Sequence, residues 1–314
     1  MERRRFPSGR ILFYLSFLAS AAVVVLFSLA YYAAGAAESE PPVQRHPAGF
    51  DRARREPGRK EAFRLRVMTL NLAHGRRQGF HQLLEGRGEI TANLEAVAAV
   101  LGREAVDVAG LQEADGPCFW SGGFDHVEFL AEGAKLAFSL RGEHVKGPGI
   151  SYGTALLSRY PLTDPRSFTF PPAPPSFPKG FVKATLFLPA RLRPRVDLVS
   201  VHLDFLRASV RARQAEVLVA RLAPRKRPMI LMGDFNCSWE EPGSAVRRIG
   251  EALGLRPPPA EAEGRAPPTF PATGKRIDWI LVSPEFEIES FRVLPEALSD
   301  HRAALVDLRY VEAE

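Results

Sequence analysis

The sequence contains only two cysteines, Cys118 and Cys237, in 314 residues. So low a number excludes a disulfide-stabilised scaffold, and neither cysteine has the spacing of a metal site. The two thiols could pair in an oxidising compartment, but we expect them to be free or buried. The chain also lacks an internal repeat, which excludes a solenoid or a propeller. Any metal site should therefore use oxygen and imidazole ligands.

Charge is absent from a long stretch near the N-terminus. No Asp, Glu, Lys or Arg occurs in residues 11–37, a stretch long enough to cross a bilayer as a helix. The four arginines of residues 1–10 form a basic flank, which favours a cytoplasmic N-terminus with the rest of the chain outside. Residues 34–36, Ala-Gly-Ala, resemble a signal-peptidase site, so secretion after signal cleavage is the alternative. The length of the apolar stretch favours a single-pass membrane anchor.

Large apolar side chains are scarce in residues 38–62, which predicts a flexible linker. Residues 1–62 hold 10 Lys and Arg against 6 Asp and Glu, which leaves 32 basic and 30 acidic residues in 63–314. The net charge of +6 is therefore largely a property of the N-terminal region. Because nonspecific DNA binders usually have a basic surface, the nearly neutral remainder disfavours DNA as the substrate.

The most informative stretch is 229–236, Met-Ile-Leu-Met-Gly-Asp-Phe-Asn. Its apolar run closed by glycine predicts a buried strand that stops abruptly. If the extended geometry continues, Asp234 and Asn236 project from the same face and can hold a phosphate or a hydrated cation. A simple turn is the alternative, because Gly, Asp and Asn are common turn residues.

Strands and helices alternate from residue 63 onward. Apolar and polar residues alternate over 64–71, which predicts a strand, and helical spacing predicts a helix over about 89–104. Further predicted elements are strands over 106–113, 154–158, 181–188, 196–201, 286–294 and 303–308, and a helix over 207–222. This order predicts one α/β domain over residues 63–314.

Polar residues stand at the edges of these strands: Asn71, Glu113, His202, Asp234, Asn236, Asp278, Asp300 and His301. Any one of them is more often a cap or a turn, but eight together favour a common site, since strand ends gather at one rim of a sheet. Carboxylates and amides without thiolates suit Mg²⁺, with Mn²⁺ as a possible substitute. Together with two histidines that can move protons, they predict metal-assisted phosphoester hydrolysis. A serine hydrolase has little support, because the strand ends supply carboxylates.

Six short motifs resemble, in order and type, the motif series of the endonuclease/exonuclease/phosphatase superfamily, the DNase I-like fold. The motifs are Thr69-Leu-Asn71, Leu111-Gln-Glu113, Ser200-Val-His-Leu-Asp204, Gly233-Asp-Phe-Asn236, Arg276-Ile-Asp278 and Ser299-Asp-His301. The resemblance covers residues 63–314. It implies a four-layer α/β sandwich, with two mixed sheets packed face to face and helices outside.

The resemblance also implies a role for each matched residue. Glu113 is similar to the principal Mg²⁺ ligand, with Asn71 beside it and Asp300 as a further contributor. Asp234 resembles the residue that orients or deprotonates the attacking water, and Asn236 resembles the one that holds the scissile phosphate. The catalytic imidazole would be His301, with Asp278 as its carboxylate partner. His202 resembles the second histidine, which contacts phosphate or assists the leaving group.

The surroundings of these motifs indicate the substrate class. Val201-His-Leu203 is the arrangement of DNase I-like and sphingomyelinase-like members, and the Tyr-x-Pro-Asn pattern of AP endonucleases is absent. His74 lies near the expected site and either contacts substrate or makes a local hydrogen bond. Phe270 is expected at the pocket wall. The other histidines, His46, His81, His126 and His144, have no supporting context and are interpreted as surface residues.

The loop from Phe168 to Phe181 carries four phenylalanines among its prolines. It could dip into a membrane or cover the site, and packing on its own domain is the alternative. Together with the anchor and the near-neutral domain, this loop favours an exported, membrane-anchored phosphodiesterase that acts on lipid headgroups. An extracellular or periplasmic nuclease is the first alternative. A noncatalytic binding module on the same fold is the second.

Overall fold

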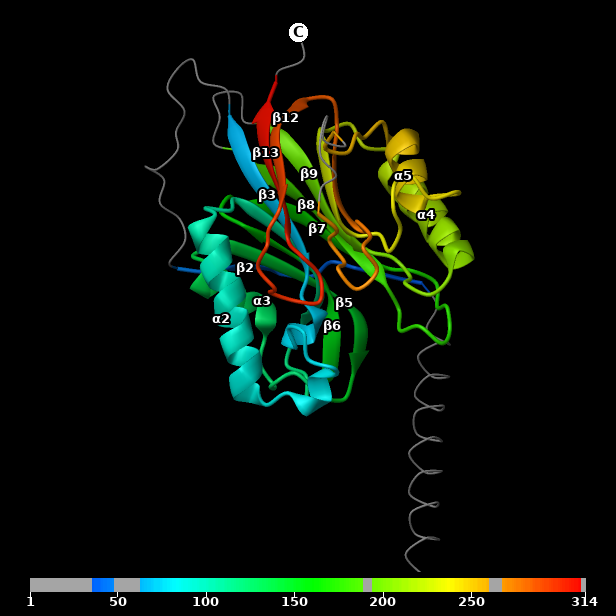
Figure 1. Ribbon diagram of the computed structural model, residues 1–314. Coiled ribbons are helices and arrows are strands. Elements are labelled where there is room, and N and C mark those ends of the chain that lie inside the picture. Colours follow the sequence, from blue (N-terminus) through cyan, green and yellow to red (C-terminus); the bar gives the residue numbers. More distant parts are fainter. Residues whose placement is uncertain (1–35, 48–62, 189–193, 260–266, 312–314) are drawn as a thin grey trace, which may run out of the picture.

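The computed structural model describes residues 36–47, 63–188, 194–259 and 267–311. Their elements form two sheets, four α-helices and two short 3₁₀ helices (Figure 1). The first sheet has the strand order β1 (Ala37–Ser39), β7 (Leu162–Thr169), β8 (Gly180–Phe187), β9 (Arg195–His202), β10 (Met229–Asp234) and β11 (Asp278–Val282). The second has the order β12 (Phe286–Val293), β13 (Ala304–Tyr310), β3 (Arg64–Asn71), β4 (Val108–Asp115), β6 (Ile150–Ser158), β5 (Phe138–Gly147) and β2 (Val43–Arg45).

Helices cover the outer faces of both sheets. The helices α2 (Arg87–Arg103) and α3 (His126–Gly133) pack on the second sheet, and α4 (Ala208–Leu222) and α5 (Ala245–Leu253) pack on the first (Figure 1). The 3₁₀ helices η1 (Ala73–Gly75) and η2 (Gln82–Leu84) follow β3. Each sheet is mixed, because β9 and β10 are parallel, as are β3 and β4, while the other pairs are antiparallel. The predicted four-layer arrangement of two mixed sheets is confirmed.

Central strands are buried on both faces, which explains their continuous apolar runs. In β10, Ile230 and Met232 point into the core between the sheets, whereas Met229 and Leu231 pack under α4 and α5. Successive side chains of a strand point to opposite faces, so one run supplies two cores. Gly233 ends this run with φ +146°, and a Cβ there would lie 2.0 Å from the carbonyl oxygen of Val201. Only glycine permits this approach of β9 and β10.

The structure corrects the linker predicted for residues 38–62. Residues 37–39 form β1, which pairs with β7, and residues 43–45 form β2, which pairs with β5. Both strands are short and polar, so their own sequence carries no strand signal; the free edges of the two sheets supply their hydrogen bonds. The rest of the linker, residues 48–62, lies outside the described residues.

The predicted membrane segment also falls mostly outside the described residues, which begin at residue 36. Within the described part of the chain, no helix has the length and apolar character needed to span a membrane. At its C-terminal end the predicted segment is one residue too long, because Ala37 already belongs to β1.

The sequence analysis did not predict several strands and helices. The strands β5 and β7 carry many polar residues, and α3 and α5 are short. The short helices are defined by their caps: the Asp125 side chain accepts hydrogen bonds at the start of α3, and Ser244 does so at the start of α5. The predicted helix over 89–104 begins two residues earlier and ends at Arg103.

Candidate active site

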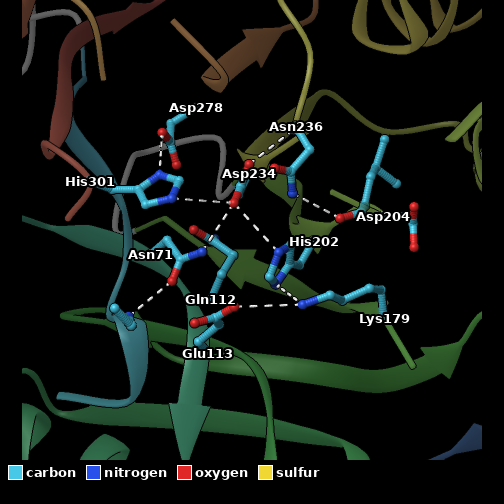
Figure 2. A network of polar contacts seen from close by, with 12 residues as sticks. Asn71, Gln112, Glu113, Lys179, His202, Asp204, Asp234, Asn236, Asp278 and His301 are labelled. Carbon is cyan, nitrogen blue, oxygen red and sulfur yellow. Dashed lines mark hydrogen bonds and ion pairs between the residues drawn. The ribbon is translucent and has the colours of Figure 1, made fainter. Parts of the chain in front are cut away.

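Strand ends from both sheets meet at one edge of the molecule (Figure 2). In the first sheet, His202 is paired with Asp234, and Asp234 is paired with Asp278. In the second sheet, Asn71 at the end of β3 is paired with Gln112 of β4. The Asn71 Nδ2 atom donates a hydrogen bond of 3.0 Å to Asp234 Oδ2, which joins the ends of the two sheets.

Asp234 lies at the centre of this network. Its Oδ1 accepts a hydrogen bond of 2.9 Å from the backbone N–H of Asn236, and its Oδ2 lies 3.4 Å from His202 Nε2 and 3.8 Å from His301 Nε2. Burial and the nearby charge of Asp278 raise the pKa of Asp234 to about 7, against the opposing effect of His301. This carboxyl group can therefore both take up and release a proton near neutral pH.

His301 is held as a cation. Its Nδ1 donates a hydrogen bond of 2.9 Å to Asp278 Oδ2, and the ring of Phe270 lies 4.8 Å from the imidazole between ring centroids. Burial disfavours the charged imidazole, but Asp278 and Asp234 outweigh it and raise the pKa of His301 to about 10. The expected pairing of His301 with Asp278, and the place of Phe270 beside the site, agree with these contacts.

His202 is the uncharged counterpart. Its Nδ1 accepts a hydrogen bond of 3.4 Å from Lys179 Nζ, which leaves the ring proton on Nε2, toward Asp234. Burial and the charge of Lys179 hold the pKa of His202 well below its usual value. The two histidines beside Asp234 thus differ in charge at neutral pH.

Glu113 leaves the regular geometry of β4. The pairing with β6 shifts register between Leu111 and Ala114, and Glu113 has φ +48°. A bulge of this kind turns a side chain toward a site. The Glu113 carboxylate lies 3.4 Å from His74 Nε2 and 3.6 Å from Lys179 Nζ. Burial opposes its ionisation, yet these two cations lower the pKa of Glu113 far below its usual range, so the group is ionised.

His74 lies behind Glu113 in η1. Its Nδ1 donates a hydrogen bond of 2.7 Å to the buried Asp115, while its Nε2 faces Glu113. Burial opposes a charge on His74, but Asp115 and Glu113 raise its pKa. The structure thus shows the local hydrogen bond that was the alternative for His74, and its contact with substrate stays a prediction.

Two of the expected residues lie differently from the sequence interpretation. Asn236 has φ +53°, so the extended geometry ends at Asp234 and the two side chains do not share a strand face. Its Nδ2 donates to the carbonyl of Leu203 at 2.9 Å, so the Asp-Phe-Asn segment is both a turn and part of the site. The Asp300 carboxylate pairs with Arg76 and accepts a hydrogen bond from the hydroxyl of Ser299, contacts that the sequence did not predict, and its contribution to a metal site stays a prediction.

The donor set fits a hard divalent cation. Asp234, Asp278 and His301 each offer one atom, all within 4.8 Å of one another, and Asp278 Oδ1 is buried without a hydrogen-bond partner among the described residues. His301, however, is protonated and donates a hydrogen bond from Nδ1 to Asp278, so neither of its ring nitrogens has a free lone pair for a metal. The Glu113 carboxylate is partly exposed and lies 3.4 Å from His74 Nε2 and 3.6 Å from Lys179 Nζ, and its role as the principal metal ligand stays a prediction. Oxygen-rich donors of this kind suit Mg²⁺ or Mn²⁺. Both cysteines are buried and free, as expected.

A serine nucleophile is not built here, although Gly149–Gly153 has the Gly-x-Ser-x-Gly spacing. Ser151 lies at the start of β6, and its hydroxyl donates to Glu143 at 2.6 Å and accepts from Arg141 at 2.7 Å. These neighbours are a carboxylate paired with Arg141 and Lys146, and a guanidinium, which differ from the histidine and acid of a serine hydrolase.

Sequence reasoning missed Lys179, which links Glu113 to His202 from the start of β8. It also placed three histidines wrongly on the surface: His46, His126 and His144 are buried, and each has a ring nitrogen bonded to a hydroxyl or a carbonyl. A buried imidazole is stable when it stays neutral and its polar atoms find partners. A lone histidine in sequence gives no sign of this.

The chain belongs to the Endonuclease/Exonuclease/phosphatase family, whose sequence profile matches residues 68–301. Among solved structures, an endonuclease/exonuclease/phosphatase from Beutenbergia cavernae superposes with a TM-score of 0.61 at 21% identity, covering 80% of this chain and 72% of that one. A mannosyl-6-phosphatase from Bacteroides thetaiotaomicron gives 0.59 at 18%, covering 78% and 100%. D. rerio TDP2 in complex with a single-strand DNA product gives 0.58 at 15%, covering 78% and 99%. At these identities the likeness establishes the fold alone. No curated protein matches the chain by sequence.

Proposed function

We propose that this protein hydrolyses a phosphodiester by direct attack of water, with the help of a bound Mg²⁺ or Mn²⁺ ion, and that its substrate carries a lipid headgroup. The observation that carries the reaction type is the position of Asp234. Its Oδ2 accepts a hydrogen bond from Asn71 of the other sheet and lies 3.4 Å from His202 Nε2 and 3.8 Å from His301 Nε2, and the raised pKa of Asp234 supports its role as a proton acceptor. Family membership supports the same reaction class.

The residues divide the work by their charge states. Ionised Asp234 accepts a proton from the attacking water while the water oxygen bonds to phosphorus and the bond to the leaving oxygen breaks. His301 Nε2 lies 3.8 Å from Asp234 Oδ2, on the side of phosphorus from which water attacks. Its Nε2–H therefore donates to a non-bridging phosphate oxygen and not to the leaving group, which departs on the opposite side. Lys179 adds a fixed positive charge beside the site. A cation held by Glu113 and Asn71 would polarise the phosphoryl group and offset charge on the leaving oxygen.

Three observations favour a lipid-type substrate. Residues 63–314 are almost neutral, residues 11–37 carry no charge, and Phe177 of the predicted membrane loop is exposed next to the site. The other three phenylalanines of that loop, Phe168, Phe170 and Phe181, are buried in the domain, which was the alternative for this loop, so only Phe177 is available for contact with a membrane.

A nuclease is the second candidate, and one observation favours it. Trp120, Tyr152 and Phe177 form an aromatic cluster beside His74, with ring centroids 5.8 to 6.5 Å apart, and Trp120 and Phe177 are the members accessible to solvent. Such rings can stack nucleobases of a single strand. The site combines an ionised Glu113, a neutral His202 and an Asp234 that can exchange a proton. This combination disfavours a noncatalytic binding module.

The test is an assay of the full chain, because β1 and β2 belong to the sheets. The protein is incubated with mixed phospholipid and sphingomyelin vesicles, with supercoiled and single-stranded DNA, and with hexose 6-phosphates. Each reaction contains Mg²⁺ or EDTA, and Asp234→Asn is the control. Headgroup release that needs Mg²⁺ and Asp234 supports the lipid substrate. Cleavage of DNA without headgroup release identifies a nuclease, and the absence of every product refutes the proposed hydrolase.

A further inference from the structure

Four large apolar side chains are exposed on the surface beside the site. The exposed fractions are 63% for Phe119, 56% for Phe177, 55% for Phe205 and 50% for Leu206. We call these four residues the apolar rim. Single exposed apolar residues are ordinary, but a group of them next to a site marks an interaction surface.

Contacts join the apolar rim into one surface. The Trp120 ring lies 5.6 Å from the ring of Phe119 and 6.5 Å from that of Phe177, between centroids. The loop that carries Phe177 is linked to the segment that carries Phe205 and Leu206. Arg207, which follows Leu206, donates a hydrogen bond of 2.6 Å from its Nη2 to the carbonyl of Ala173 in the loop. Three segments distant in sequence are therefore held in a fixed relation.

The same surface borders the candidate active site. Lys179 Nζ lies 5.8 Å from the ring centroid of Phe205 and 3.6 Å from the Glu113 carboxylate. On the other side, Trp120 Nε1 donates a hydrogen bond of 3.1 Å to Asp115, the acid that holds His74. Anything that covers the rim is thus brought next to Glu113.

The N-terminal strand enters the domain at this edge. One row of paired residues crosses the first sheet and runs through Ala37, Thr169, Gly180, His202 and Asp234. Three strand spacings, about 14 Å, separate Ala37 from His202. Because β1 is antiparallel to β7, which ends at Thr169, β1 begins at the catalytic side of the sheet; Figure 1 shows β1 beside the loop that follows β7.

No flexible linker separates the uncharged segment from the sheet. Glu38 Oε2 accepts a hydrogen bond of 2.5 Å from Arg221, and Glu40 is paired with Arg166 of β7. The uncharged residues of the N-terminal segment end where β1 begins. An anchor formed by that segment would therefore fix which edge of the domain lies next to the membrane.

We propose that the catalytic edge faces the bilayer that holds residues 11–36, and that the apolar rim lies in the interfacial layer of that bilayer. Aromatic and aliphatic side chains are stable at this depth. The inference rests on the proposed function, since it brings a lipid headgroup to Glu113 and Asp234 without release of the lipid from the membrane.

The experiment measures which edge of the domain contacts lipid. The full chain is reconstituted in bilayer nanodiscs made with or without brominated phosphatidylcholine, which quenches nearby tryptophan. Phe177→Trp reports on the rim, and Phe205→Trp repeats the test from a second segment. Val311→Trp is the matched control, because Val311 is an exposed apolar residue just after β13. Since β13 is antiparallel to β3, Val311 lies near the start of β3, at the far end of that strand from Asn71. The signal of the three native tryptophans, measured on the unsubstituted chain, is subtracted.

We expect bromolipid to quench the tryptophan at position 177 or 205 several-fold more than the one at position 311. Equal quenching, or stronger quenching at position 311, would overturn the proposal, as would cleavage after Ala36 with loss of the domain from the bilayer. A tryptophan at 177 that responds to single-stranded DNA but not to bromolipid would assign the rim to nucleic acid instead. Tryptophan quenching does not depend on catalytic activity. Failure of the orientation proposal therefore appears as a change in quenching, whereas failure of the proposed function appears only in the activity assay.

Discussion

Two carboxyl groups of the site, Glu113 and Asp234, have pKa values shifted in opposite directions. Asp234 is buried and Glu113 is partly buried, so the loss of hydration alone would raise both values. Glu113 has two cations beside it, His74 and Lys179, and stays ionised. Asp234 has a second acid, Asp278, beside it, and its pKa rises to about 7. The neighbours, and not the depth of burial, thus make one group a fixed anion and the other a proton acceptor.

The largest expected effect follows removal of the proton acceptor. Asp234→Asn keeps the shape of the side chain and its hydrogen bond to the backbone of Asn236, but it cannot take a proton. We expect kcat to fall by about 10³-fold, the scale of a lost general base. The melting temperature should fall only modestly, because the amide nitrogen in place of Oδ2 cannot accept the hydrogen bond from Asn71 Nδ2 while the rest of the fold is unchanged. A large fall in melting temperature with the loss of activity would show that Asp234 is chiefly structural.

Replacing the fixed anion should affect the metal requirement. In Glu113→Gln we expect the Mg²⁺ concentration for half-maximal rate to rise about 10- to 100-fold, with part of the rate restored at high Mg²⁺. Asp300→Asn is the matched control, since its carboxylate is paired with Arg76. If Asp300→Asn shifts the Mg²⁺ dependence and Glu113→Gln does not, the metal site has been assigned to the wrong carboxylate.

Lys179 lies between Glu113 and His202, the histidine that faces Asp234. Lys179→Met removes the cation that stabilises Glu113 and keeps His202 neutral, and we expect kcat to fall about 10²-fold, as for loss of one preorganised donor. Lys183→Met, on the same strand, breaks an ion pair of 3.0 Å with Asp197 away from the site and should leave kcat unchanged. Equal losses in the two variants would point to a general effect on β8.

The smallest effect concerns His144, a buried histidine whose pKa is lowered mainly by burial. Burial, with a smaller contribution from the charge of Lys179, lowers the pKa of His144 to about 3, whereas Asp278 and Asp234 raise the pKa of buried His301 to about 10. The unfolded chain protonates His144 below about pH 6.5, while the folded protein does not, so this residue destabilises the fold as pH falls from 6.5 toward 3.

His144→Gln should remove this contribution, up to about 1.4 kcal/mol per pH unit below pH 6.5, from the free energy of unfolding. Urea unfolding at several pH values measures it, with His81→Gln as the exposed control. An unchanged pH dependence in His144→Gln would mean that the buried imidazole is already charged.

The sequence allowed the residues at strand ends to be predicted, because an apolar run buried on both faces must stop where a polar side chain appears. Asn71, Glu113, His202 and Asp234 follow directly from that rule. Lys179 could not be found in this way, since it follows a proline-rich loop and reaches the site only through the pairing of β8 with β9. The strands β1 and β2 were missed for a related reason, because their stability comes from the sheet edges they join.

The pH dependence of hydrolysis tests the role of Asp234 most directly. The rate at saturating Mg²⁺ would be measured with a phosphodiester substrate from about pH 5 to about pH 9. Since Asp234 must be ionised to accept a proton, we expect the rate to rise about tenfold per pH unit below about pH 7 and then to level off. A rate that is independent of pH across this range, or that falls as pH rises through 7, would contradict Asp234 as the base.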